Sequence, residues 1–405
     1  MQPSLIRLAK IYKAFLFLLP LLFLPLEIEW FETPKQFLIT LVAVITLPTL
    51  ITNRHDLKEI LEDNLTTLLF ALFFVLTLTS LANGYFGYSL LGSPFRRDGL
   101  ISIWSLFSVY LGFCILYEYK FETYLIESVK SSALAVAILG MIQFLLGYTT
   151  IWNGDYFFDG RITSTLGQPN FLSAFLLTSL PFFIRKEKFH SIGLGIIVMC
   201  LALTFSRLNL LLIVIALIFS ILRAANKKIK YLGICFLTIC AIGTIIFFTT
   251  VRTDEIYNKI RKNPRLYQLQ RNFFFLSKEQ LYGEKRFAIY AAGIETILER
   301  PVIGYGKAMI EPAMRDNLRK YPVLDTLVVD SSHNIIIDIA IEGGVLALSL
   351  LIALLSLTLY RLSSANLWSY KYAFLLLVIS SQFFITSIVA FVYLMMLTAK
   401  TTTQN

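Results

Sequence analysis

Two arginines beside long apolar runs are the first candidates for chemistry in this chain. Arg207 lies in LALTFSRLNLLLIV, with apolar residues on both sides. An ionised side chain beside hydrocarbon usually faces a polar cavity or a partner, although an arginine in a tight turn can also reach the membrane surface. Arg161 lies in GRITSTLGQPN, which leads into an apolar segment. This stretch forms either an ordinary helix start near Gln168 or Asn170 or an anion site at a helix N-terminus.

His333 adds a group that can take up a proton near neutral pH. It lies in DSSHN, directly before another apolar segment, and taken alone it can equally be a solvated loop histidine. Arginine forks bind phosphate bidentately and can stabilise a departing diphosphate. The four cysteines lie inside apolar runs, and no Cys, His and carboxylate cluster has metal-ligand spacing. Together these residues predict metal-free chemistry on an anion.

The elements that must position these side chains are predicted to be transmembrane helices. The chain is 57% apolar and 15% charged, with a mean hydropathy of +0.70, whereas an average soluble domain is about 45–50% apolar and about 25% charged. The apolar residues fall in blocks long enough to span a bilayer. The net charge of +10 is therefore interpreted by the positive-inside rule and not as a nucleic-acid surface.

The pattern predicts an all-α, polytopic transmembrane bundle of eleven or twelve helices. No small-residue cleavage site follows the first apolar run, which favours an uncleaved first helix over a signal peptide. The last run is long for one tilted helix and short for two. The expected helices cover 11–28, 34–52, 65–82, 98–117, 125–147, 168–184, 190–206, 208–223, 230–250, 335–360 and 371–398.

Lysines and arginines concentrate in alternate short loops, which predicts that those loops and the N-terminus are cytoplasmic. Residues 1–250 then form the N-terminal membrane helices, 251–334 a large extracytoplasmic loop with short helices around 255–262 and 284–299, and 335–405 the C-terminal helices. Five arginines fall on the outer face, where topology does not explain positive charge: Arg96, Arg97, Arg161, Arg207 and Arg286.

Four strings in order resemble the O-antigen ligase and O-antigen polymerase superfamily. GRITSTLGQPNFLSAFLL is similar to its GR-x-x-G-T-F-G-N-P-N-x-L-A stretch, and LTFSR to its T-x-S-R turn between two helices. ERPVIGYG is similar to its "drPllGyG" segment, and DSSHNIIIDIAIEGGVLAL to its H-N-x-x-L…E-x-G-x-x-G element. The motifs cover roughly residues 150–350, and the order of helices and outer loop matches throughout.

The resemblance implies a GT-C-like membrane enzyme in the plasma (inner) membrane. Such proteins transfer a glycan from an undecaprenyl-diphosphate carrier to a hydroxyl of a glycan, lipid or protein acceptor, without a nucleotide sugar, cofactor or metal. The resemblance assigns His333 as the group that activates the acceptor. It also assigns the diphosphate-binding residues Arg161, Arg207 and Arg286 and the supporting residues Asn334, Asn170 and Ser206.

The sequence departs from the family pattern after Arg286. Phe287 and Tyr290 follow it where the family often has Trp, so Lys285 and Arg271 compete for this position. Two other functions also fit the composition. A transporter or flippase of lipid-linked sugars would explain the multi-helix bundle, and a structural or sensory protein would explain the outer loop but not the arginines. Ligase, polymerase and protein-glycosylating members share these motifs, so the acceptor stays open.

Overall fold

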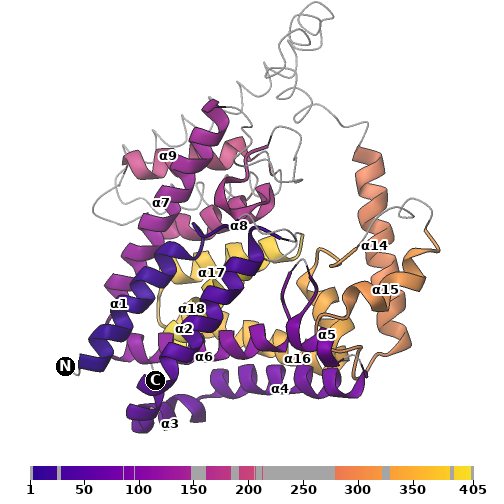
Figure 1. Ribbon diagram of the computed structural model, residues 1–405, viewed down its shortest axis with the longest axis horizontal. Coiled ribbons are helices and arrows are strands. Elements are labelled where there is room, and N and C mark those ends of the chain that lie inside the picture. Colours follow the sequence, from indigo (N-terminus) through magenta and orange to yellow (C-terminus); the bar gives the residue numbers. More distant parts are fainter. Residues whose placement is uncertain are drawn as a thin grey trace, which may run out of the picture.

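The computed structural model describes residues 3–24, 29–84, 86–94, 96–146, 161–183, 191–204, 206, 212, 279–321, 329–383 and 387–402. Within these ranges every regular element is a helix, and no strand occurs (Figure 1). Five of the described helices are long and apolar enough to cross a membrane: α2 (Glu32–Thr52), α4 (Asn64–Ala82), α6 (Leu100–Glu118), α7 (Glu122–Leu146) and α16 (Ile335–Ser364). The expected all-α, multi-pass membrane protein is therefore confirmed.

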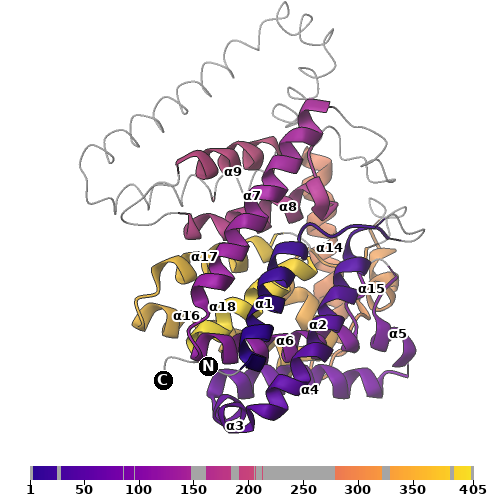
Figure 2. The same ribbon diagram turned by 60° about the vertical axis from the view of Figure 1, so that its left-hand side comes forward.

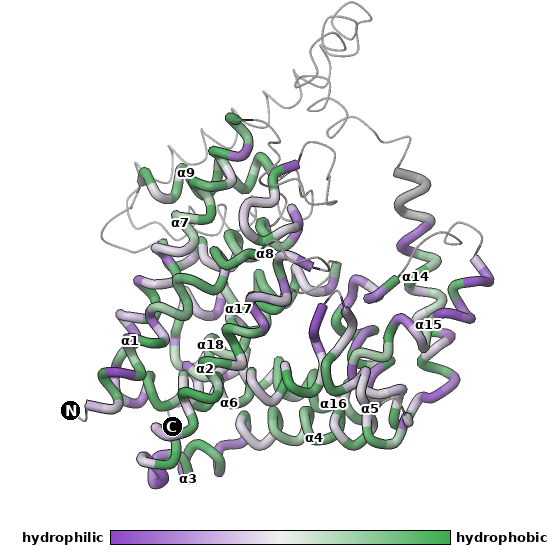
Figure 3. The backbone as a smooth tube through the Cα atoms, in the orientation of Figure 1, coloured by the Kyte–Doolittle hydropathy of each residue, from purple (hydrophilic) through white to green (hydrophobic). Residues whose placement is uncertain are grey.

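Helix α6 lies at the centre of the bundle. In its most apolar stretch 89% of the residues are buried, against 39–44% in the other four long helices. It packs against α2, α4 and α18 (Ile388–Thr402). Gly112 of α6 permits the close approach of α1 (Pro3–Leu18), because a Cβ at this position would overlap the Tyr12 hydroxyl. Figure 3 shows the bundle helices as mostly apolar, with polar residues gathered at α3 (Arg54–Glu62) and around α15 (Ile310–Leu318).

Two ion pairs join helices at one end of the bundle. Arg361, in the last turn of α16, donates to Asp63 at the start of α4, with an N–O distance of 2.7 Å. Lys400 of α18 donates to Glu122 of α7 at 2.7 Å. Because α16 finishes where α4 starts, the two helices run antiparallel. The start of α16 and the end of α4 therefore meet at the other end of the bundle.

Most predicted helices occur with small shifts in their bounds. The helix expected at 11–28 is α1, which begins earlier and ends at Leu18. The run at 371–398, for which the sequence left one or two helices open, forms two helices, α17 (Trp368–Ser381) and α18. Bounds close to those expected are also found for α8 (Pro169–Ser179), α9 (Ser191–Leu203) and α14 (Glu279–Glu299). The expected helices at 208–223, 230–250 and 255–262 lie outside the described residues.

Three short helices were not predicted: α3, α5 (Phe86–Leu91) and α15. Each is too short or too polar to register as a membrane helix. Both α5 and α15 lie at the end of the bundle where α4 finishes, and α14 packs with α15 and α16 at that same end. Figure 2 shows this group beside the far end of α4 from another side.

Two of the family-like strings interlock at a kink in α16. Gly344 has φ 64° and ψ −165°, which splits the helix into residues 335–343 and 345–364. The freed carbonyls of Ile341 and Glu342 accept the N–H groups of Tyr305 and Gly306, both at 2.8 Å. No side chain fits at Gly344, because a Cβ there would overlap the Val302 carbonyl. The ERPVIGYG segment therefore replaces the helical hydrogen bonds that the kink removes.

Candidate active site

His333 lies immediately before the first turn of α16, in a loop fixed by hydrogen bonds. Asn334 caps the helix, because its Oδ1 accepts the N–H groups of Ile336 at 2.9 Å and Ile337 at 3.3 Å. Asp338 accepts from the Ser332 N–H at 2.8 Å and from the Ser331 hydroxyl at 2.6 Å. His333 itself has φ 62°. This left-handed conformation is costly for a non-glycine residue, so the loop holds the imidazole in a set place.

Two arginines from distant parts of the chain lower the pKa of this imidazole. The pKa of His333 is lowered to about 4, first by burial and then by the charges of Arg286 on α14 and Arg96 before α6, against the opposing effect of Asp330. His333 is therefore neutral at physiological pH and has a free electron pair on one ring nitrogen. The predicted residues His333 and Arg286 are brought together here. Arg96 joins them, although the sequence pointed only to its unexplained outer position.

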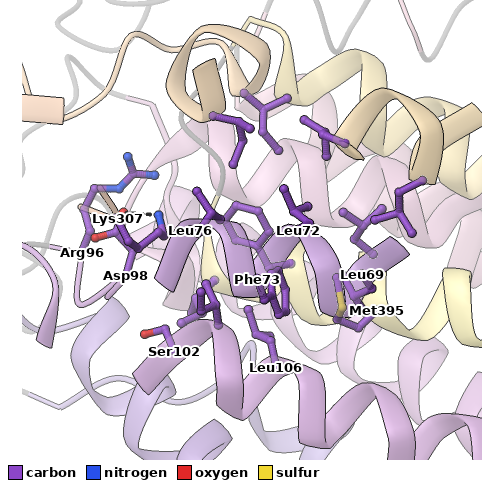
Figure 4. Close-up of a pocket in the computed structure, with 18 of the residues that line it drawn as sticks. Leu69, Leu72, Phe73, Leu76, Arg96, Asp98, Ser102, Leu106, Lys307 and Met395 are labelled. Carbon is purple, nitrogen blue, oxygen red and sulfur yellow. Dashed lines mark ion pairs between the residues drawn. The ribbon is translucent and has the colours of Figure 1, made fainter. Parts of the chain in front are cut away.

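The segment that carries Arg96 is held by a buried charge cluster (Figure 4). Lys307 donates to Glu342 Oε1 at 2.7 Å and lies 3.6 Å from Asp98 Oδ2. Burial alone would raise the pKa of Asp98, but the charges of Lys307 and Arg96 outweigh it and lower this pKa. Burial likewise opposes the ionised form of Lys307, and Glu342 and Asp98 outweigh it and raise the Lys307 pKa. The cluster therefore joins the Arg96 loop to the kink of α16.

A narrow apolar cavity begins beside these charges. It encloses about 80 Å³, and Figure 4 shows Arg96, Asp98 and Lys307 side by side at one end. Apart from Glu32 and Ser102, the rest of the lining is apolar and comes mainly from α4, α6, α16 and α18: Leu69, Leu72, Phe73, Leu76, Ile103, Leu106, Ile335, Ile339, Leu351, Leu354, Ile388, Phe391, Leu394 and Met395. The cavity is therefore charged at one end, where two cations lie beside acidic groups, and apolar along most of its length.

Glu32 also lines this cavity, at the first turn of α2. Its Oε2 accepts the Ile388 N–H at 2.8 Å, whereas its buried Oε1 has no hydrogen-bond partner among the described residues. Buried carboxylate oxygens are rarely left in this state. Glu32 is therefore a further polar group that can meet a ligand in the cavity.

Arg161 belongs to a second group of contacts around the GRITSTLG loop. Its Nε–H donates to the Thr204 carbonyl at 2.7 Å, and its Nη2 donates to Asn170 Oδ1 at 3.0 Å. Thr204 belongs to the LTFSR string, so the structure joins two of the family-like strings directly. Asn170 orients Arg161 and does not itself cap α8, since the N-cap of that helix is Gln168 and makes no side-chain cap bond.

The GRITSTLG loop is buried and is held by hydrogen bonds from two helices, α7 and α2. Gln143 Oε1 accepts the N–H groups of Thr163 at 3.0 Å and Ser164 at 2.8 Å. The fully buried Lys35 donates to the Thr165 carbonyl at 3.2 Å. Lys35 stands one turn after Glu32 on α2, so this helix start contacts both the loop and the apolar cavity.

The remaining predicted residues divide into two sets. Arg207 and the competitor Arg271 lie outside the described residues. Ser206 is buried, and its hydroxyl has no partner among the described residues, while Lys285 lies on α14, one position before Arg286. Where the chain is described, no group of three or more His, Cys, Asp and Glu residues is placed to hold a metal ion.

Several site residues were missed in the sequence although they carried a signal. Glu32, Lys35 and Glu342 are ionisable residues inside or at the start of apolar spans, which is a mark of function or of a buried pair. Lys307 directly follows ERPVIGYG.

Comparison with known proteins agrees with the resemblance of the family-like strings to the O-antigen ligase superfamily. Residues 192–352 match the family described as O-antigen ligase. The chain is also similar to the ComP-specific O-oligosaccharyltransferase of Acinetobacter baylyi, with 25% identity over 344 residues. That alignment covers 79% of this chain and 58% of the relative, so the chain spans less than two thirds of the relative's length.

Proposed function

Because the chain is a member of the O-antigen ligase superfamily, we propose that it transfers a glycan from an undecaprenyl-diphosphate carrier to an acceptor hydroxyl. The observation that carries this proposal is that Arg96, at the charged end of the apolar cavity, acts together with Arg286 on the pKa of His333. A polyprenyl diphosphate has the matching chemistry, with a highly charged head group and a hydrocarbon tail. The bundle end that holds these groups faces the outside of the plasma membrane in this proposal.

The arginines bind the diphosphate and stabilise it as it leaves. A guanidinium group can donate two parallel hydrogen bonds to phosphate oxygens. Partial shielding from water strengthens the electrostatic attraction in each of these contacts. Arg96 and Arg286 act beside His333, and Arg161 and Arg207 complete the set from the GRITSTLG loop and the LTFSR turn. The cavity is smaller than the roughly 150 Å³ cavities that admit a benzene ring. It therefore receives only the first carbons of the tail unless its side chains move.

His333 accepts the proton of the acceptor. The acceptor oxygen attacks the anomeric carbon of the carrier-bound sugar, a new C–O bond forms, and the bond from that carbon to the diphosphate oxygen breaks. The electron pair of the broken bond leaves with undecaprenyl diphosphate, and the acceptor proton goes to the neutral imidazole. Bound diphosphate offsets the arginine charges that lower the His333 pKa, so the imidazole becomes a stronger base when the donor is present.

The acceptor class follows from which hydroxyl reaches His333: a glycan repeat, a lipid-linked core or a protein side chain. The oligosaccharyltransferase named among the relatives makes a protein side chain the first acceptor to test.

The test uses purified protein in lipid nanodiscs with a defined carrier-linked glycan and each acceptor class in turn. We expect transfer with the native chain and loss of at least about 100-fold, the low end for a removed acid–base group, with His333→Gln. Arg96→Ala and Arg286→Ala lose activity as well, whereas the exposed Arg319→Ala on α15 is a matched arginine control that keeps it. Full activity in His333→Gln would refute the site. Translocation of the donor in sealed vesicles without bond exchange would support a flippase instead.

A further inference from the structure

Helix α14 has two apolar faces, and the described residues cover one of them. Ala288, Ile289 and Ala292 are buried in a small core that α14 shares with α15 and α16. On the opposite side Phe287, Ile294 and Leu298 are 77%, 52% and 71% exposed. With 3.6 residues per turn, these three side chains point within about 40° of one another. They form a continuous exposed stripe along the helix.

The exposed apolar stripe on α14 continues onto the exposed apolar surface of the candidate span α16. After α14 the chain exposes Val302 (60%) and Ile303 (53%). The Val345 N–H donates to the Pro301 carbonyl at 2.8 Å, so this loop lies against the start of the 345–364 part of α16. Val345 is itself 53% exposed. In a multi-pass membrane protein, the exposed apolar side chains of a span face lipid, and the stripe continues that lipid-facing surface onto α14.

The direction of α14 fits a helix that lies along a membrane surface. Figures 1 and 2 both show α14 running across the direction of α4, at the end where α4 finishes. Since α4 is a candidate span, the axis of α14 crosses the direction of that span. Charged side chains border the stripe, with Arg286 along one edge and Glu295 along the other. This is the pattern of a helix at the lipid–water interface.

We propose that α14 rests in the bilayer interface, with Phe287, Ile294 and Leu298 inserted among the lipid chains. The continuity with α16 favours lipid over a soluble protein partner, which would have to cover a span surface as well. One consequence concerns Arg286, the neighbour of Phe287, which is then held at the depth of the lipid head groups. The proposal concerns a lipid contact only and does not depend on the proposed glycan transfer.

Spin labels on α14 test the contact directly. In a chain whose four native cysteines are replaced by alanine, a nitroxide is attached at Phe287→Cys, at Leu298→Cys and, as a solvent control on α15, at Asp316→Cys. Each protein is placed in nanodiscs, and its collision rates with oxygen, which concentrates in lipid, and with a water-soluble nickel chelate are measured. We expect the oxygen-to-nickel ratio at 287 and 298 to exceed that at 316 severalfold.

Two results overturn the proposal. A ratio at 287 and 298 equal to that at 316 shows that the stripe faces water. Low collision rates with both reagents at 287 and 298 show that another part of the protein covers it. A third label at Glu299→Cys, beside the stripe on the same helix, checks the readout, since its ratio should lie between those of Leu298→Cys and Asp316→Cys.

Discussion

The pKa of His333 makes a prediction about stability that can be worked through. Its pKa falls from the ordinary 6.5 to about 4 in the folded protein, first through burial and then through Arg286. The unfolded chain therefore binds a proton at a pH where the folded chain does not. One pKa unit corresponds to about 1.4 kcal/mol, so the free energy of unfolding should fall by at most about 3 kcal/mol as the pH drops from 6.5 to about 4. The remaining solvent contact of the imidazole makes this an upper limit.

The variant His333→Gln isolates this contribution. It keeps a polar side chain of similar size but binds no proton in this range, so its unfolding free energy should lose less on acidification than that of the native chain. The comparison is made in the same mixed micelles above pH 6.5 and again near pH 4. Equal losses in the two proteins would refute the stated environment of His333.

The same imidazole can be observed directly, because the chain holds only three histidines. In the spectrum of histidine-labelled protein, the signal that disappears in His333→Gln should remain that of a neutral ring down to a pH near 4. Added inorganic diphosphate should raise this pKa if it binds beside Arg96 and Arg286. An ordinary titration near pH 6.5 without diphosphate, or a pKa that does not change when diphosphate is added, would contradict the argument.

Three further substitutions test the contacts that hold the site. Lys307→Met should lower the free energy of unfolding by about 3–5 kcal/mol, because it leaves Glu342 buried without its cation, and adding Glu342→Gln should restore much of the loss in a double-mutant cycle. Gly344→Ala should cost at least about 1–3 kcal/mol from backbone strain, whereas Gly195→Ala, at an open helical position, should be neutral or stabilising in the same denaturation assay. Asn334→Ala should cost about 1 kcal/mol through the lost cap of α16, and Asn334→Asp should keep the stability.

The length of the apolar segments in the sequence was enough to predict much of the fold. The spans α2, α4, α6 and α7 lie within three residues of the predicted bounds, because each is an uninterrupted apolar block of bilayer length. For 371–398 the sequence left one or two helices open, because the run is apolar throughout and its total length cannot reveal where one helix ends and the next begins. The interfacial helices α5 and α15 carry no span-like pattern and depend on tertiary packing.

The site was predictable in its residue types but not in its connections. The resemblance assigned His333, Arg286, Arg161 and Arg207 to one site. Among the described residues Arg286 acts on His333, whereas Arg161 contacts Thr204 and Asn170. Nothing local indicated that Lys307 pairs with Glu342, because 35 positions separate them and only the kink at Gly344 brings them together. Arg96 was noted as an outer charge, and its proximity to His333 depends on how the segment before α6 folds back over the bundle.

The interlock between ERPVIGYG and α16 also determines how fast its backbone exchanges hydrogen with solvent. Tyr305 and Gly306 lie in an irregular loop, where amide protons ordinarily exchange quickly. Their amides instead donate to carbonyls inside a helix, and Val345 donates back to Pro301. These three protons should therefore exchange as slowly as those of the helix core, so that in deuterium uptake the loop and the two halves of α16 open together as one cooperative unit.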